Sequence, residues 1–223
     1  MTLVEPASSL TDFALGVLDL MIAGRLRPKE TTDAHWRWFF VWIGIAGLWG
    51  GFHHGLVVGH ETAAAFSWSA ISLLVAISIS YLLAASVNTV LGKGHGHPLL
   101  AIRAISLAVF FSLVVSGNAS VITLMLTGGL AMALVIGLWL HAWQKDQSAV
   151  GLVLAAIVAR RLAAALKASS LQFNMGGREF DPNSLYHMAQ MPGLLLMLLA
   201  IQRRADATGG QRLRRGANVA VPV

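Results

Sequence analysis

The chain has 223 residues, of which 56% are hydrophobic and 12% are charged, and its mean hydropathy is +0.68. A soluble domain carries about 25% charged residues, so this composition excludes an ordinary soluble fold and predicts an integral membrane protein. The absence of cysteine excludes disulfides, thiolate-held iron–sulfur clusters and a cysteine nucleophile, and the net charge of +6 lies in short loops and a tail, which indicates membrane orientation rather than nucleic-acid binding.

Seven apolar segments follow one another along the chain, each near the ~20 residues that cross a bilayer as a helix. They lack the alternation of apolar and polar residues that is typical of a transmembrane β-strand. The predicted fold is therefore an all-α polytopic membrane protein, a seven-transmembrane helix bundle over residues 1–202, followed by a basic, disordered tail over 203–223. The segments are Ser8–Ala23, Trp36–Val58, Phe66–Leu91, Leu99–Ser116, Val121–Trp143, Ala149–Leu166 and Ser184–Ile201.

The basic residues predict how this bundle is oriented. They occur after the first segment (Arg25, Arg27), after the third (Lys93), after the fifth (Lys145) and throughout the tail, whereas the loops after the second and fourth segments contain none. Cytoplasmic loops carry an excess of lysine and arginine. The N-terminus is therefore predicted outside and the C-terminus inside, which agrees with an odd number of spans.

With this orientation, polar residues from three distant segments are expected at the same outer depth. Asp12 lies near the outer end of the first segment, and the stretch "WGGFHHG" places His53 and His54 at the outer end of the second. Asn183 and His187 lie in the first turns of the seventh segment. Ionisable groups inside a membrane usually face the bundle interior or a water-filled cavity, so these side chains are predicted to meet.

The residue types in this predicted cluster suggest metal chemistry. Two or three histidines with a carboxylate and an open position are typical of a catalytic zinc site. Adjacent helical residues differ in direction by ~100°, so one of His53 and His54 faces the cluster and the other faces a neighbouring helix or the headgroups. Asp12 is then a ligand, a partner that orients a histidine, or a general base. The alternative is that these groups only form hydrogen bonds at the membrane interface.

Two further features predict helix contacts. Asp19 lies on the same face of the first segment as Asp12, and Arg160 and Arg161 interrupt the sixth, so a buried ion pair between these segments is expected. Small residues on one face of the second segment predict close approach of a neighbouring helix. These residues are Gly44, Gly47 and Gly51.

The motifs "GGFHHG" and "DPNSLYHMAQM" resemble an uncharacterised group of bacterial seven-helix membrane proteins, itself distantly similar to the alkaline ceramidase and adiponectin-receptor superfamily of membrane hydrolases. In that superfamily a Ser-x-x-x-His pattern on the second helix and a His-x-x-x-His pattern on the seventh hold zinc. The matching positions here are Gly50 and His54, and Asn183 and His187. The serine and one zinc histidine are thus replaced, and the superfamily's third-helix aspartate has no counterpart.

The resemblance implies a multi-pass protein of the bacterial inner membrane. Its first expected function is zinc-dependent hydrolysis of a lipid amide or ester, with His54, His187, His53 and Asn183 as candidate metal ligands and Asp12 as the catalytic acid–base. The second is a non-catalytic accessory subunit of a larger membrane complex. The third is a b-type haem protein with His54 and His187 as axial ligands. Membrane lipids, and other membrane subunits, are the expected partners, and nucleic acid is not.

Overall fold

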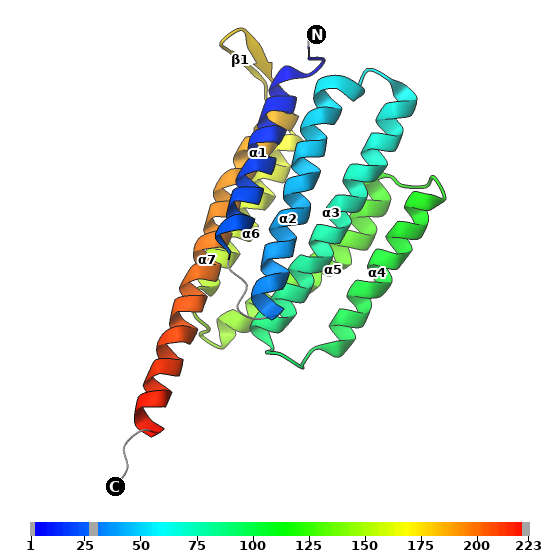
Figure 1. Ribbon diagram of the computed structural model, residues 1–223. Coiled ribbons are helices and arrows are strands. Elements are labelled where there is room, and N and C mark those ends of the chain that lie inside the picture. Colours follow the sequence, from blue (N-terminus) through cyan, green and yellow to red (C-terminus); the bar gives the residue numbers. More distant parts are fainter. Residues whose placement is uncertain (1–2, 27–30, 220–223) are drawn as a thin grey trace.

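The computed structural model describes residues 3–26 and 31–219, which form seven α-helices, a π-helical turn and a β-hairpin (Figure 1). The predicted all-α fold is confirmed. The elements in chain order are α1 (Pro6–Arg25), α2 (Thr31–Phe52), the π-helix η1 (His53–Val57), α3 (Glu61–Val90), α4 (His97–Val115), α5 (Val121–Gln144), α6 (Val150–Lys167), β1 (Phe173–Met175), β2 (Arg178–Phe180) and α7 (Pro182–Val219).

Within the described residues, six of the helices are long and apolar enough to cross a membrane. Each of the seven predicted segments coincides with a helix, but α6 is not among the six, because Arg160, Arg161 and Lys167 place three cations within its 18 residues. The candidate spans are Pro6–Arg25, Thr32–Val57, Glu61–Val90, His97–Val115, Ile122–Gln144 and Pro182–Ala207.

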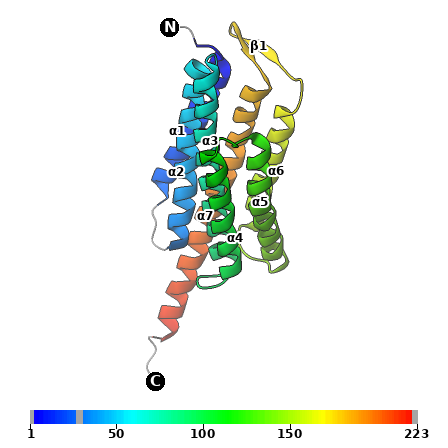
Figure 2. The same ribbon diagram turned by 90° about the vertical axis from the view of Figure 1, so that its right-hand side faces the viewer.

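The first and last helices of the chain lie side by side. Helix α1 packs against both α2 and α7, and α6 packs along α7. Helices α1 and α7 begin at the same end of the bundle, which is also the end where α2 passes into η1 (Figures 1 and 2). The start of α1, the end of α2 and the start of α7 are therefore neighbours in space.

The apolar core lies between α1, α2, α3, α5, α6 and α7, toward the middle and the other end of the bundle. Trp139 is fully buried there and donates its indole Nε1–H to Ser86 Oγ at 3.1 Å. Helix α4 is peripheral, since Phe110 is the single buried residue of its described length. The largest fully buried apolar side chains are Trp139, Phe40, Phe110, Ile22, Leu83, Leu194, Val87, Val135 and Val153.

Helices α1 and α2 approach each other through small residues, as predicted for the second segment. A Cβ atom on Gly16 would lie 2.6 Å from the backbone N of Leu48 and 2.8 Å from the backbone O of Gly44. Only the absence of a side chain permits this spacing, because both neighbouring atoms belong to the main chain. One turn earlier on α1, the same close approach brings Asp12 against Gly50.

The predicted ion pair of Asp19 differs from what the structure shows. Asp19 is fully buried, and within the described part of the chain neither of its carboxylate oxygens has a hydrogen-bond partner. Arg160 acts on this carboxylate electrostatically, but its guanidinium donates to Gln190 Oε1 at 3.0 Å. The α6 arginine therefore binds a neutral amide of α7, with which α6 is closely packed.

The C-terminal segment also differs from the prediction. Its polar, glycine-containing composition predicts disorder over residues 203–223, whereas α7 continues as one helix from Pro182 to Val219. Pro192 lies inside this helix without ending it. Arg204 anchors the helix beyond the predicted span by donating to the backbone oxygens of Thr89 (3.0 Å) and Ser148 (3.1 Å). Beyond these contacts α7 projects from the bundle (Figure 1).

Candidate functional site

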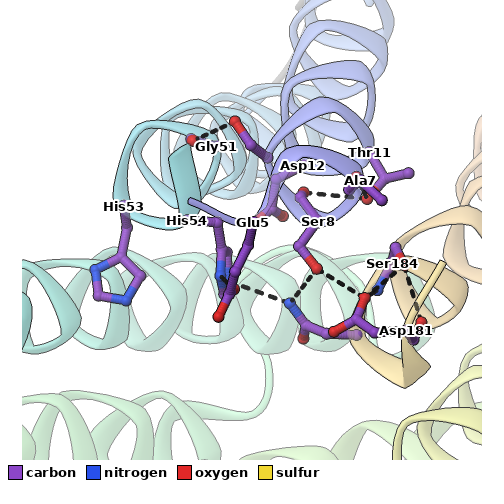
Figure 3. A network of polar contacts seen from close by, with 12 residues as sticks. Glu5, Ala7, Ser8, Thr11, Asp12, Gly51, His53, His54, Asp181 and Ser184 are labelled. Atoms are coloured by element: carbon purple, nitrogen blue, oxygen red, sulfur yellow. Dashed lines mark hydrogen bonds and ion pairs between the residues drawn. The ribbon is translucent and has the colours of Figure 1, made fainter. Parts of the chain in front are cut away.

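Polar side chains from α1, η1 and α7 meet at one end of the bundle (Figure 3). The carboxylate of Asp12 lies between two imidazoles, with Oδ1 3.3 Å from His187 Nε2 and Oδ2 3.8 Å from His54 Nε2. All three side chains are largely buried. The structure thus brings together the three residues on which the sequence-based hypothesis depends.

The π-helix η1 explains how a residue that the sequence did not indicate joins this site. π-Helical turns disturb the regular hydrogen-bond pattern of a helix and are frequent at functional sites. Here the backbone oxygen of His54 accepts the N–H of Glu5 (3.1 Å), and that of Gly55 accepts the N–H of Val4 (3.0 Å). These bonds hold the segment before α1 across η1, so that Glu5 Oε2 lies 2.6 Å from His54 Nδ1.

The hydrogen bonds of His54 define its tautomer. Its Nδ1–H donates to the Glu5 carboxylate, and its Nε2 accepts the amide N–H of Asn183 at 3.1 Å. Nε2 therefore carries a lone pair, and it faces Asp12. A histidine whose Nδ1–H is held by a carboxylate while Nε2 stays unprotonated is the arrangement that metal-binding imidazoles adopt.

The same reasoning applies to His187. Its Nδ1 lies 3.2 Å from Thr11 Oγ1. The single proton of the Thr11 hydroxyl has the backbone oxygens of Ala7 (2.9 Å) and Ser8 (3.1 Å) within reach. When it donates to either of them, the hydroxyl oxygen accepts Nδ1–H of His187, and in that tautomer His187 Nε2 carries a lone pair toward Asp12.

In this tautomer of His187, two nitrogen lone pairs and a carboxylate face one another in a buried space. Such groups repel unless a proton or a cation lies among them, because each presents negative electron density. The arrangement at His54, Asp12 and His187 is therefore suited either to hold a shared proton or to bind a metal ion.

His53 lies outside this cluster. Its Nδ1 is 3.0 Å from Ser67 Oγ, which also accepts the indole N–H of Trp49 at 3.0 Å. Figure 3 shows His53 turned away from Asp12 while His54 points toward Glu5. The prediction that only one of the two adjacent histidines faces the cluster is confirmed.

Lys167 adds a positive charge beside the cluster. It ends α6, interacts electrostatically with Asp12 and Asp181, and its Nζ lies 4.9 Å from the centroid of the Tyr186 ring. No sequence motif indicates this role, since the contact depends on how the end of α6 packs against the start of α7.

Asp181 caps α7 and ties it to α1. Its Oδ1 accepts hydrogen bonds from the backbone N (2.9 Å) and Oγ (2.5 Å) of Ser184 and from Ser8 Oγ (2.9 Å). Burial alone would raise the pKa of Asp181, but these hydrogen bonds from Ser184 and Ser8 outweigh it and hold the pKa below its ordinary value. Asn183, which contacts His54, thereby sits in a fixed first turn of α7.

Replacing Asp181 with alanine is expected to lower the free energy of unfolding by about 1–2 kcal/mol at neutral pH, through loss of the helix cap. Because the pKa of the folded carboxyl lies below its ordinary 3.8, the stabilisation by the ionised form is complete above pH 3.8 and is lost as the pH falls through the folded pKa. Thermal unfolding of the detergent-solubilised protein at a series of pH values around 3.8 measures this loss of stability. Asp181→Asn retains a capping oxygen and should lack the acid-dependent step, so an unchanged pH profile in that variant would contradict the assignment.

The cluster is not a finished metal centre. Among residues 3–26 and 31–219, no group of three or more histidine, aspartate and glutamate side chains is already arranged to hold a metal ion. At His54 the Asn183 amide N–H binds the Nε2 lone pair that a metal ion would need. Rotation of this amide would free Nε2 and turn the amide oxygen toward the same space.

The haem alternative fits these residues less well. A haem between two axial histidines needs a gap as wide as its macrocycle. Instead, both His54 Nε2 and His187 Nε2 lie within 4 Å of the Asp12 carboxylate. The geometry therefore favours a small cation over haem.

Comparison with known proteins identifies a family but no chemical activity for this site. No curated protein and no solved structure matches the chain at a significant level. A family model does match, over residues 7–206, which include α1, the cluster and the part of α7 that packs in the bundle. The chain therefore belongs to the family of unknown function DUF6962.

Proposed function

We propose that the protein is a membrane-embedded, zinc-dependent hydrolase that acts on a lipid amide or ester at the outer face of a bacterial inner membrane. His54, His187 and Asp12 are the proposed ligands, with Asn183 beside them and Lys167 as the nearby cation. The observation that carries this proposal is that the Nε2 atoms of His54 and His187 both lie within 4 Å of the buried Asp12 carboxylate.

One of the two distances at Asp12 matches the spacing of zinc ligands. Zinc binds imidazole nitrogen and carboxylate oxygen at ~2.0–2.2 Å in tetrahedral geometry, so its ligand atoms lie about 3.3 Å apart. His187 Nε2 lies 3.3 Å from Asp12 Oδ1, whereas His54 Nε2 lies 3.8 Å from Oδ2 and would have to move closer. Glu5 and Thr11 contact the opposite ring nitrogens, and such contacts favour the metal-binding tautomer.

A bound zinc supplies a water of lowered pKa and polarises a carbonyl group. The residues of the chain would orient the zinc ligands and bind the substrate. Glu5 orients His54, and the exposed lipid-facing side chains of α1 next to the site offer a surface for an acyl chain. They are Leu10, Phe13 and Val17, which are 43%, 37% and 49% exposed.

The decisive experiment measures zinc in the purified, detergent-solubilised protein after reloading and removal of free metal. Wild type is expected to retain about one zinc per chain, and His54→Ala and His187→Ala are expected to lose it. His53→Ala is the matched control, because His53 adjoins His54 in sequence but binds Ser67. A chelator should abolish hydrolysis of a fluorogenic acyl amide or ester by wild type.

Equal zinc content in all four proteins would overturn the metal site. Absence of zinc from wild type, together with purification in a stoichiometric membrane complex, would instead favour the accessory subunit. A Soret band would favour haem.

A further inference from the structure

The segment between α6 and α7 forms a β-hairpin that has no part in the histidine cluster. Strands β1 and β2 pair antiparallel, with Phe173 opposite Phe180 and Met175 opposite Arg178. Gly176 and Gly177 make the turn with φ of 60° and 73°. Two consecutive positive φ values are typical of the two-residue turn that matches the twist of a hairpin.

The register gives this hairpin two chemically different faces. Residues directly opposite each other share a face, as do residues two apart on one strand. One face therefore carries Phe173, Met175, Arg178 and Phe180, with the rings of Phe173 and Phe180 stacked at 5.2 Å. The other face carries the polar pair Asn174 and Glu179. The hairpin is amphipathic, and its charges are segregated, with the cation on the apolar face and the anion opposite.

The apolar face is exposed. Phe173 and Met175 are 42% and 57% exposed, and Leu171, two residues before Phe173, is 56% exposed. An isolated two-stranded hairpin is marginally stable at best in water, and large exposed apolar patches mark contact surfaces. Stability of this hairpin therefore requires an apolar neighbour for the face that the chain leaves open.

The position of the hairpin indicates a bilayer as that neighbour. It connects the end of α6 to the start of α7, and β2 contacts α1 and α7. Apart from these contacts of β2, the hairpin projects beyond the helices at the end of the bundle that holds the cluster (Figures 1 and 2). Lys167 lies against Tyr186 at the same level, and aromatic and basic side chains gather at membrane interfaces.

We propose that the hairpin lies in the membrane interface, with Leu171, Phe173 and Met175 inserted at the boundary of headgroups and acyl chains and Arg178 bound to lipid phosphate. The outward acidic Glu179 would then face water. This separation of charge complements a phosphate-bearing surface. The inference does not use the histidine cluster and stands apart from the proposed hydrolase activity.

The chain contains no cysteine, so single-cysteine labelling of the full-length protein tests the proposal directly. Met175→Cys and Asn174→Cys form a matched pair from adjacent, exposed positions on opposite faces. A nitroxide spin label is attached to the cysteine of each variant, and the labelled protein is reconstituted into vesicles of phosphatidylcholine and phosphatidylglycerol. Collision rates with oxygen, which partitions into lipid, and with a water-soluble nickel chelate are measured by electron paramagnetic resonance. Thermal unfolding matching that of wild type confirms that both labelled chains are folded.

The nitroxide at position 175 is expected to collide several-fold more with oxygen than with nickel, and the one at position 174 to show the reverse. Adding Arg178→Gln to the Met175→Cys chain should increase nickel collisions at 175. Equal, water-like accessibility at both positions would overturn the insertion. Protection of position 175 from both reagents would show that protein, rather than lipid, covers the face. An unchanged signal in the Arg178→Gln chain would overturn phosphate binding.

Discussion

Replacing Gly16 with alanine is expected to lower the free energy of unfolding by about 3 kcal/mol, because overpacking against rigid neighbours is among the costliest core changes. The new Cβ would lie 2.6 Å from Leu48 N and 2.8 Å from Gly44 O. These are main-chain atoms of α2, which no side-chain rotation can move. Helices α1 and α2 would have to separate, and the measurement is the unfolding temperature of the purified protein in detergent.

Gly24→Ala is the matched control on the same helix. A Cβ at Gly24 would meet nothing within 4 Å, and replacing an unconstrained helical glycine with alanine stabilises a protein by about 0.4–1 kcal/mol. Gly16→Ala and Gly24→Ala are thus expected to shift the unfolding temperature in opposite directions. If the two variants unfolded at the same temperature, the close contact of α1 with α2 would be wrong.

For the proposed zinc site, Gly50→Ala is expected to weaken zinc binding about 10–100-fold, the usual effect of disturbing the residues that position a metal ligand. A Cβ at this position would lie 2.5 Å from Asp12 Oδ2 and 3.0 Å from its Cγ. The clash is with the far end of a side chain, so the carboxylate would turn away from the imidazoles while the helices stay in place. Zinc titration against a competing chelator gives the affinity, and thermal unfolding shows that the fold persists.

The neighbouring Gly51 supplies the control for this second prediction. A Cβ there would meet the ring of Phe13 at 2.7 Å, and this ring is 37% exposed and free to move outward. Gly51→Ala should therefore leave zinc affinity close to that of wild type. A similar loss of affinity in both variants would indicate a general disturbance of α2 rather than displacement of Asp12.

The contact between Gly50 and Asp12 also bears on the resemblance to the ceramidase and adiponectin-receptor superfamily. In the resemblance proposed from the sequence, the serine of that superfamily's second-helix motif corresponds to Gly50. In this structure the space next to Gly50 holds the carboxylate of Asp12. A side chain in place of Gly50 would occupy the space that this acid from the first helix fills.

The helices and the histidine cluster followed from the sequence because both depend on simple regularities. Apolar length predicts each helix, and the alternating direction of successive spans places Asp12, His54 and His187 at one depth. The approach of both histidines to within 4 Å of Asp12 could therefore be expected without knowledge of side-chain packing. The sequence also favours His54 over His53, because His54 matches the second-helix motif of the resemblance, and His54 is the histidine that lies beside Asp12.

The positions of other residues of the site depend on long-range contacts that no local sequence pattern indicates. Glu5 reaches His54 only because η1 leaves carbonyl groups free for the segment before α1. Lys167 reaches the cluster through the packing of α6 on α7. The hairpin did carry a signal, since Gly176 and Gly177 divide a short stretch of alternating polar and apolar residues.

The errors at Asp19 and in the tail have physical causes as well. Opposite charges at compatible depths predicted an ion pair, but Arg160 is held by Gln190 instead. The tail's composition predicts disorder, whereas α7 runs on to Val219. At the start of this tail Arg204 binds carbonyl groups at the end of the bundle opposite the histidine cluster.

The adjacency of α1 and α7 sets an order for biosynthesis. Asp12 is synthesised with the first helix, whereas His187, which lies 3.3 Å from it, is synthesised with the last. If the chain inserts into a bilayer in the order of its synthesis, as the proposed membrane location implies, the acid has only one of its two histidines, His54, beside it until α7 arrives, in an environment that penalises charge. The nascent protein must then tolerate or shield that group through the synthesis of five intervening helices.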